Sequence, residues 1–279
     1  MTHATGTRTS PDGLTLFTRR WTPDRPVRGT VVLVHGVHEH SGRYAYLASA
    51  LMARGFEVRA LDLRGHGQSE GPRGQVEAFD DYLRDLRPVL EDTLEEADTP
   101  VFLMGHSMGG LVVAATVVER GTDGLAGVIL SSPALRVDSP APLRALAPWI
   151  ARWFPDLPVT RLDLGRLSRD PTVERAYRED PLTSTQGVRA RLGLEILRAT
   201  ERVQMHPEAF DVPLYLFHGT ADRLTDPEGS RWLAEHAASE DVTLTLYDGY
   251  LHETLNEPER DEVIDALADW IDAHLDGAA

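Results

Sequence analysis

Short apolar runs alternate along this chain with longer segments in which apolar residues recur at helical spacing. Short runs rich in β-branched residues are typical of strands that are buried on both faces. We predict such strands at Thr30–Val34, Phe56–Leu61, Val101–Met104, Gly127–Leu130, Leu214–Phe217 and Thr243–Tyr247. Alternation of apolar and polar residues predicts an edge strand at Leu14–Trp21.

Helices are predicted between these strands, at Tyr44–Arg54, Tyr82–Ala97, Leu111–Arg120, Gly229–Ala238 and Glu259–Leu275. Strands that alternate with helices form βαβ units, whose sheet is mostly parallel. The interval from Leu135 to Phe210 breaks this rhythm, because it shows no clear strand and is rich in Arg, Pro and amphipathic pattern. We therefore predict an α/β core formed by residues 1–134 and 211–279, with a helical cap at residues 135–210 inserted between two halves of the sheet.

One stretch of the predicted cap is unusually apolar and aromatic. It contains Leu143, Leu146, Trp149, Ile150, Trp153 and Phe154. Packing against the core is the simpler interpretation. The alternative is that part of this stretch lines an acyl-chain pocket or faces lipid, as lids do.

Composition narrows the possible functions. The 279 residues include no cysteine, which excludes disulfides, thiolate nucleophiles, Cys-ligated zinc and iron–sulfur clusters. The net charge of −16 disfavours nucleic-acid binding, because phosphate contacts need clustered cations. The first ten residues lack the apolar core of a signal peptide, and no apolar run is long enough to span a bilayer. We expect a cytoplasmic enzyme.

The strongest candidate for chemistry is Gly105-His106-Ser107-Met108-Gly109. A bare Gly-x-Ser-x-Gly pattern is weak, but here a predicted strand precedes it and an apolar helix follows. That is the setting of a nucleophile elbow, a sharp turn that exposes the serine hydroxyl. The two glycines allow strand and helix to approach closely. We predict Ser107 as the nucleophile.

A serine hydroxyl needs a base that takes its proton, and an acid that orients the base. In enzymes built on such an elbow, the order along the chain is serine, acid, histidine. Asp222 lies just past a predicted strand and is our candidate acid, whereas Asp226 begins a helix and is interpreted as its cap. His252 follows the last predicted strand and is the candidate base. His206, in the cap, and His218, at a strand end, compete poorly for that role.

An oxyanion hole should complete such a site. One donor is expected to be the backbone N–H of Met108, which follows the nucleophile, and the other that of Val37, in the loop after Thr30–Val34. Each such donor is worth about 3 kcal/mol of barrier.

Several segments together resemble the monoacylglycerol lipase family of α/β-hydrolases. They are His35-Gly36-Val37-His38-Glu39-His40-Ser41-Gly42-Arg43-Tyr44, Asp62-Leu63-Arg64-Gly65-His66-Gly67-Gln68-Ser69-Glu70-Gly71, the Ser107 motif extended to Gly110, Asp180-Pro181-Leu182, Gly219-Thr220-Ala221-Asp222-Arg223-Leu224 and the His252 loop. The resemblance implies the α/β-hydrolase fold and hydrolysis of monoacylglycerol to fatty acid and glycerol, with no cofactor or metal.

The resemblance also implies a polar pocket for the glycerol head, lined by Glu39, Arg43, His106 and Tyr177. A different interpretation of the first two is an ion pair at a helix start. Val37 is bulkier than the small residue expected at its position, which would narrow the head-group site.

Three kinds of function remain open from the sequence. The leading one is an esterase acting on monoacylglycerol or a similar lipid ester, with at most transient membrane or micelle contact through the cap. A lysophospholipase, a short-chain esterase or a peptidase is the second. Dehalogenases and epoxide hydrolases normally place Asp at the elbow, so Ser107 argues against both. A catalytically silent binding protein is the third, and a missing triad residue would support it; none is missing.

Overall fold

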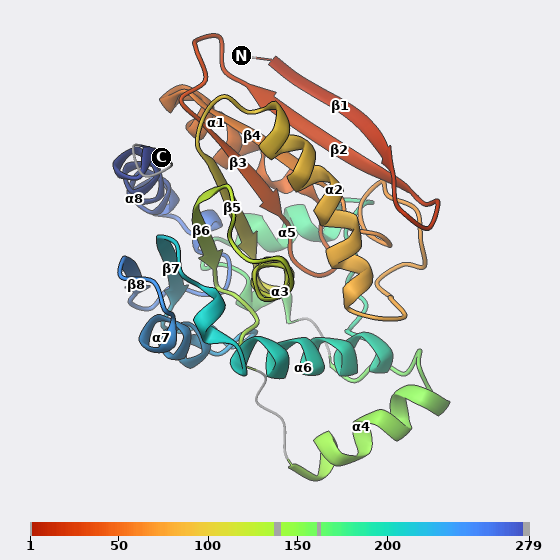
Figure 1. Ribbon diagram of the computed structural model, residues 1–279. Helices are drawn as coiled ribbons and strands as arrows, with labels where there is room; N and C mark the ends of the chain where they lie inside the picture. Colours follow the sequence, from red (N-terminus) through yellow and green to blue (C-terminus); the bar gives the residue numbers. More distant parts are fainter. Residues whose placement is uncertain (1, 137–140, 161–162, 276–279) are drawn as a thin grey trace.

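The computed structural model describes residues 2–136, 141–160 and 163–275. Its strands form one sheet in the order β1-β2-β4-β3-β5-β6-β7-β8 (Figure 1). The neighbours β1–β2 and β2–β4 are antiparallel, and every other pair is parallel. This confirms the predicted, mostly parallel α/β sheet. The strand bounds are β1 Thr2–Thr9, β2 Thr15–Thr22, β3 Gly29–Val34, β4 Phe56–Leu61, β5 Val101–His106, β6 Leu125–Ser131, β7 Leu214–Gly219 and β8 Val242–Tyr247.

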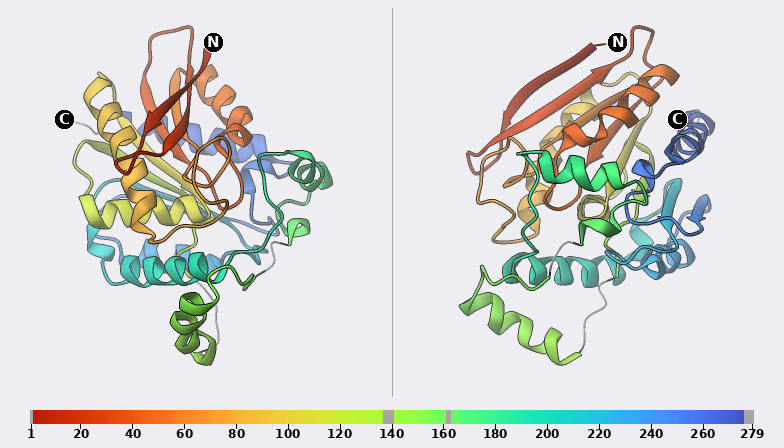
Figure 2. Two further views of the ribbon diagram at one scale, coloured as in Figure 1. Left: turned by 90° about the vertical axis from the view of Figure 1, so that its right-hand side faces the viewer. Right: turned by 180° about the vertical axis from the view of Figure 1, so that it is seen from behind.

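Helices cover both faces of the sheet (Figures 1 and 2). The central strand β3 shows why, since its successive side chains point to opposite faces. Val31 and Leu33 belong to the apolar cluster that includes α1 (Ala45–Arg54) and α8 (Arg260–Ala273). Val32 and Val34 belong to the cluster on the other face, which includes helices α2 Asp80–Glu96, α3 Met108–Arg120 and α7 Pro227–His236. Burial on both faces explains the continuous apolar runs of the central strands.

The N-terminal strand β1 was not predicted, and it changes the place of its neighbour. All eight residues Thr2–Thr9 pair with Thr15–Thr22, so β2 lies between β1 and β4 and is not an edge strand. Nearly all of β1 is exposed, and its sequence is small and polar. A strand with no buried face leaves no hydrophobic pattern, which is why the periodicity of the sequence missed it.

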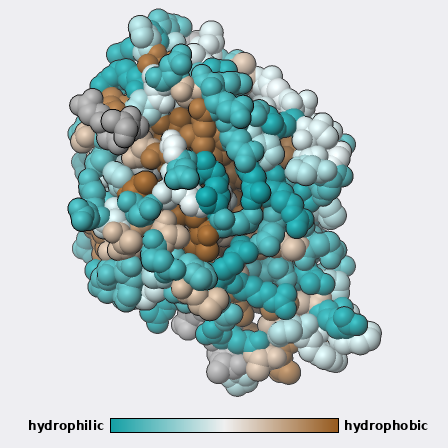
Figure 3. Space-filling model, viewed as in Figure 1, coloured by the Kyte–Doolittle hydropathy of each residue, from teal (hydrophilic) through white to brown (hydrophobic). Residues whose placement is uncertain are grey.

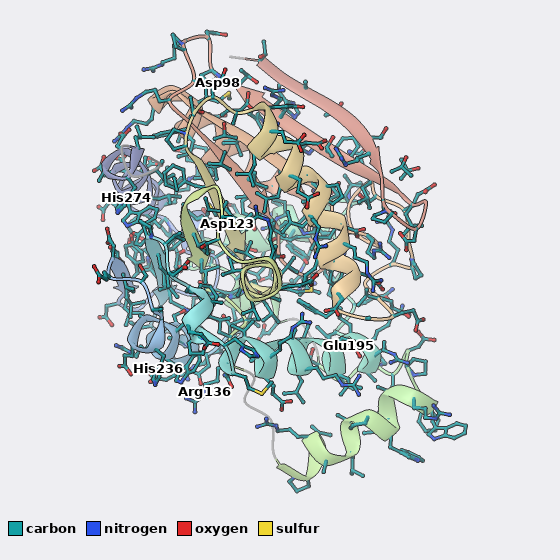
Figure 4. All side chains as sticks on the ribbon, in the orientation of Figure 1. Asp98, Asp123, Arg136, Glu195, His236 and His274 are labelled. Carbon is teal, nitrogen blue, oxygen red and sulfur yellow. The ribbon has the colours of Figure 1, made fainter. Side chains whose placement is uncertain are left out.

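Helices fill the interval between β6 and β7, as predicted. They are α4 (Ala141–Trp153), α5 (Pro171–Glu179) and α6 (Ala190–Gln204). Helix α6 is bonded to the core: the Thr200 hydroxyl donates to the Ala134 carbonyl at 3.0 Å, and Glu195 accepts from the Phe79 N–H at 3.3 Å (Figure 4 labels Glu195). Helix α4 lies beyond α6, at the end of the molecule farthest from β1 (Figures 1 and 2).

The apolar stretch of the cap does not pack on the core, so the simpler interpretation was wrong. Leu146, Trp149 and Trp153 keep 55, 58 and 61 % of their surface exposed, and Leu143, Phe154, Leu157 and Val159 are also exposed. Figure 3 shows hydrophobic atoms on this projecting part of the molecule, within a largely hydrophilic surface.

The turn between β5 and α3 is among the tightest in the fold. Ser107 has φ 55° and ψ −120°, a strained backbone for a residue with a side chain. A Cβ added to Gly105 would lie 2.3 Å from the Gly109 carbonyl oxygen. A Cβ on Gly109 would lie 2.3 Å from the carbonyl oxygens of Val34 and His35, at the end of β3. Both glycines are therefore required for strand and helix to meet at Ser107.

We expect Gly109→Ala to lower the free energy of unfolding by about 1–3 kcal/mol or to prevent folding, because backbone atoms cannot rotate away from the new methyl group. Urea unfolding followed by circular dichroism measures this. Gly165→Ala is the matched control, since nothing lies closer than 3.5 Å to its Cβ position. Equal unfolding midpoints for the two variants would contradict the packing described for the turn.

Candidate active site

Four loops meet at the carboxyl ends of the parallel strands. Ser107 follows β5, Val37 follows β3, Asp222 follows β7 and His252 follows β8. Parallel strands end at one edge of a sheet, so residues far apart in the chain become neighbours there. This edge, and not any single segment, creates the site.

Ser107, His252 and Asp222 form a hydrogen-bonded series. The Ser107 Oγ lies 2.9 Å from His252 Nε2, and His252 Nδ1 lies 2.7 Å from Asp222 Oδ2. All three residues are buried. The distances suit a hydroxyl that donates to Nε2 while Nδ1–H donates to the carboxylate, which is the geometry of a nucleophile, its base and an orienting acid.

The carboxylate of Asp222 has every acceptor position occupied. Its Oδ2 also accepts from His218 Nε2 at 3.0 Å and the Thr225 hydroxyl at 2.8 Å, and its Oδ1 accepts from the Leu224 N–H at 2.7 Å. Burial raises the pKa of Asp222, but the effect of His252 and His218 is larger and in the opposite direction. The pKa is therefore well below its usual range. The group therefore stays ionised although it is buried.

His218 was set aside in the sequence analysis, and the structure places it in the support of the acid. Its Nδ1 accepts from the Ser230 hydroxyl at 2.8 Å, which leaves Nε2–H to donate to Asp222. The four-residue separation between His218 and Asp222 was the available signal. Asp226 is the helix cap that we predicted, accepting from the Glu228 N–H at 3.0 Å. His206 is remote from this network and pairs with Glu208.

The two imidazoles of the site differ in pKa. Burial lowers the pKa of His252, but the Asp222 carboxylate at 2.7 Å, assisted by Glu253 and Glu39, more than offsets this and raises the pKa above that of an ordinary histidine. His106 has no such partner, and burial lowers its pKa to about 4. Near neutral pH, His252 can exchange a proton while His106 remains neutral.

The two predicted oxyanion donors, Val37 and Met108, both line the cavity beside Ser107. Met108 is the first residue of α3, so its N–H has no acceptor within the helix. The loop that holds Val37 lies close to the nucleophile, since a Cβ on Gly36 would be 3.2 Å from Ser107 Cβ. The arrangement can supply two N–H groups to an oxygen bonded to the attacked carbon.

Of the four residues expected around a glycerol head, Glu39, His106 and Tyr177 line the cavity. Arg43 is not among the described residues that line it. Its guanidinium lies 2.6 Å from Glu39 Oε2, so the ion-pair interpretation describes the structure. The Tyr177 hydroxyl donates to the His38 carbonyl at 2.7 Å, which ties the cap to the loop that holds Val37.

The cavity has a volume of about 670 Å³ and is lined by both core and cap. Its apolar lining includes Leu167, Val188 and Ile196 of the cap and Ala134 of the core. Charged residues also line it: Arg136 (labelled in Figure 4), Arg223, Asp226, Glu228 and Arg231. Within the described residues, no group of three or more His, Asp or Glu side chains is placed to hold a metal ion.

The fold and the site together define a serine hydrolase of the α/β-hydrolase class. Residues 25–259 match the family described as serine aminopeptidase, S33. The monoacylglycerol lipase of Mycolicibacterium smegmatis is 38% identical over 91% of this chain and 92% of its own length. The crystal structure of a Paleococcus ferrophilus monoacylglycerol lipase superposes with a TM-score of 0.82 and 37% identity, covering 93% of this chain and 99% of that one.

A further relative, phospholipase YtpA of Bacillus subtilis, is 32% identical over 91% of this chain and 99% of its own length. Taken together, these matches show that the chain belongs to the monoacylglycerol lipase family of α/β-hydrolases, as the sequence motifs indicated. It is a carboxylic-ester hydrolase of that family.

Activity should fall with acid as His252, whose pKa is raised by Asp222, becomes protonated. Asp222→Asn removes the nearest negative charge, so the acid limb of the kcat/KM profile should move to lower pH, and kcat should drop by about 10⁴-fold. Steady-state kinetics on a p-nitrophenyl ester between pH 5 and 9 measures both effects. Asp248→Asn is the control, because Asp248 is an exposed carboxylate near the same loops. An acid limb that stays in place in Asp222→Asn would contradict the assigned contact.

Proposed function

We propose that this chain hydrolyses monoacylglycerols to fatty acid and glycerol through an acyl-enzyme on Ser107. The observation that carries the proposal is the Ser107–His252–Asp222 series at the wall of a cavity that combines an apolar lining with polar groups beside the nucleophile. The lipase activity named for the relatives supports the same substrate class.

The geometry supports the following sequence of steps. His252 Nε2 removes the Ser107 proton as Oγ attacks the ester carbonyl carbon. The resulting oxyanion accepts hydrogen bonds from the Val37 and Met108 N–H groups. Protonated His252, held by Asp222, gives the proton to the glycerol oxygen as the C–O bond breaks. Water then repeats the attack on the acyl-enzyme, and the fatty acid leaves.

The cavity suits the two halves of such a substrate. Leu167, Val188 and Ile196 provide an apolar wall for an acyl chain. Glu39 and His106 are buried polar groups that line the cavity with Ser107, and they are placed to bind glycerol hydroxyls. A buried polar group without a hydrogen-bond partner is costly. Glu39 and His106 therefore favour a head group whose hydroxyls can pair with them over a plain alcohol.

Ser107→Ala should abolish hydrolysis of 1-monoacylglycerols and labelling by a fluorophosphonate, because no other hydroxyl lies in hydrogen bond with His252 Nε2 in the described residues. Release of fatty acid measures the first, and gel fluorescence the second. Wild-type activity in Ser107→Ala would overturn the mechanism. Wild-type activity confined to the shortest p-nitrophenyl esters would overturn the lipid substrate.

A lysophospholipid is the second candidate substrate. The exposed Arg223 lines the cavity, and it makes no ion pair with any residue in the described part of the chain. A free guanidinium there can bind a phosphate group. Hydrolysis of lysophospholipid that falls in Arg223→Gln, with monoacylglycerol hydrolysis unchanged, would support this substrate.

The cap supplies a surface for transient contact with a lipid membrane or micelle. The exposed apolar residues of 143–159 lie on the projecting helix α4 and just after it. Residues 135–210 contain twelve arginines and ten acidic residues, whereas the whole chain has a net charge of −16. The cap thus lacks the excess of acidic residues that the chain as a whole carries, so an anionic lipid surface does not repel it as it repels the whole chain. No helix among the described residues has the length and apolarity to cross a bilayer.

Replacing Trp149 and Trp153 with Ser should lower activity on monoacylglycerol in phosphatidylcholine vesicles several-fold, because apolar surface that contacts lipid is lost. Activity on water-soluble p-nitrophenyl butyrate should stay unchanged. Tyr46→Ser is the control, since Tyr46 is an exposed aromatic residue on α1. An equal loss on both substrates would contradict a role in lipid contact.

A further inference from the structure

One guanidinium connects three parts of the active site. Arg43 lies within the short 3₁₀ helix at Ser41–Tyr44, close after the loop that holds Val37. Its Nη1 and Nη2 each lie 2.8 Å from an oxygen of Glu253, so the pair is bidentate. Nη1 also donates to Glu39 at 2.6 Å, and the guanidinium lies 4.8 Å from the centre of the Tyr177 ring.

Each partner of Arg43 holds a different functional segment. Glu39 accepts from the Gly36 N–H at 2.6 Å, which fixes the oxyanion loop. Glu253 is the residue after His252, and its N–H donates to the Leu167 carbonyl of the cap at 2.7 Å. Tyr177 belongs to α5 of the cap, and its hydroxyl reaches back to the oxyanion loop at His38.

The ion pair is enclosed by protein. The side chains of Glu39 and Glu253 are each 5 % exposed, and that of Arg43 is 12 % exposed. Glu39 and Glu253 line the substrate cavity, but Arg43 lies behind them. Three of the five Arg43 N–H bonds are already directed at carboxylates. A glycerol molecule in the cavity would meet the carboxylates first.

We propose that Arg43 and Glu253 are positioning residues, whose buried ion pair holds the oxyanion loop, the His252 loop and the cap in the arrangement that acyl transfer requires. This inference rests on the proposed role of Ser107 and His252. It replaces the direct contact between Arg43 and glycerol that the family resemblance implies. A planar, bidentate guanidinium is suited to such a task, because it fixes direction as well as distance.

The same cluster also acts on His252 through its charge. The groups facing His252 are Asp222 from the loop after β7, Glu253 from its own loop, Glu39 from the oxyanion loop and the neutral His106, whose ring centre is 4.8 Å away. Arg43 compensates one of the two negative charges of Glu39 and Glu253. Removing Glu253 should therefore lower the pKa of His252, and removing Arg43 should raise it.

The test compares Arg43→Met, Arg43→Lys and Glu253→Gln on two substrates, a 1-monoacylglycerol and p-nitrophenyl butyrate, which has no glycerol. We expect kcat to fall on both esters by the same factor, about 10²-fold, since a small misplacement of catalytic groups has effects of that size. In the two Arg43 variants, KM for the monoacylglycerol should change less than about threefold, because Arg43 does not bind its head group.

The pH profiles separate charge from geometry. The acid limb should move to lower pH in Glu253→Gln and to higher pH in Arg43→Met. Arg43→Lys keeps the charge but loses the bidentate pair, so its acid limb should return to the wild-type position while kcat stays low. Arg178→Lys and Glu174→Gln, from an exposed ion pair of α5, are the matched controls and should leave every parameter unchanged.

Three results would overturn the proposal. A raised KM for monoacylglycerol alone, with p-nitrophenyl butyrate unaffected, would make Arg43 a head-group ligand. A lower melting temperature with unchanged kcat and acid limb would make the pair merely structural. An acid limb that moves the same way in Arg43→Met and Glu253→Gln would refute the charge assignment. If Arg43→Met fails to fold, the kinetics and pH profiles of Arg43→Lys and Glu253→Gln still test the proposal.

A failure of the proposed function can be distinguished from a failure of the positioning role. A wild-type protein that cleaves p-nitrophenyl butyrate but no monoacylglycerol would remove the lipid substrate, and the positioning role would still be measured on the soluble ester. Wild-type activity in Ser107→Ala would instead remove the mechanism on which both proposals depend.

Discussion

The close approach of β3, β5 and α3 at Ser107 governs the rest of the site. Gly109 packs directly on the carbonyl oxygens at the end of β3, and Gly105 on the first turn of α3. Because β3 is held this close, the loop that follows it lies against the nucleophile, with Gly36 beside Ser107. The loop that holds Val37 and the turn that holds Ser107 and Met108 are therefore fixed against each other. A side chain at either glycine would separate them.

The second constraint is that buried charged groups need hydrogen-bond partners. Two groups of buried charges near Ser107 have such partners. Asp222 is held by His252, His218, Thr225 and backbone N–H groups, so a carboxylate with almost no exposed surface remains ionised. Glu39, Arg43 and Glu253 form the other buried group. Low local polarity strengthens these interactions, and an unpaired member would be costly. Asp222 is hydrogen-bonded to His252, and Glu253 follows His252 in the chain, so the charges of both networks act on the proton affinity of His252.

The helical insertion divides into two parts with different contacts. Leu167 and Tyr177 hydrogen-bond to the loops of His252 and Val37, so this part belongs to the site. Helix α4 instead exposes Trp149 and Trp153. The residues that contact the loops beside Ser107 and the exposed apolar residues are thus separate parts of one insertion. A substitution in one part is expected to leave the task of the other intact.

The pattern of apolar and polar residues predicted most of the elements in this chain, because a central strand that is buried on both faces has a continuous apolar sequence. The order Ser107, Asp222, His252 also followed from the sequence, since each residue has a recognisable place at the end of a strand or in the loop after it. Strand β1 was not predicted, because a strand that is exposed on both faces has no hydrophobic pattern. The sequence left the exposure of α4 as an alternative to core packing, since an apolar helix face has the same pattern whether protein or lipid covers it.

Tertiary structure alone decided what lies around the triad. Arg43 and Glu253 are 210 positions apart, and their bidentate pair depends on where two strands of the same sheet end. His218 supports Asp222 because a turn after β7 folds back on its own strand end. Sequence periodicity reports which face of an element is buried. It does not report which charged groups from distant segments meet there, and those meetings set the pKa values and the geometry of this site.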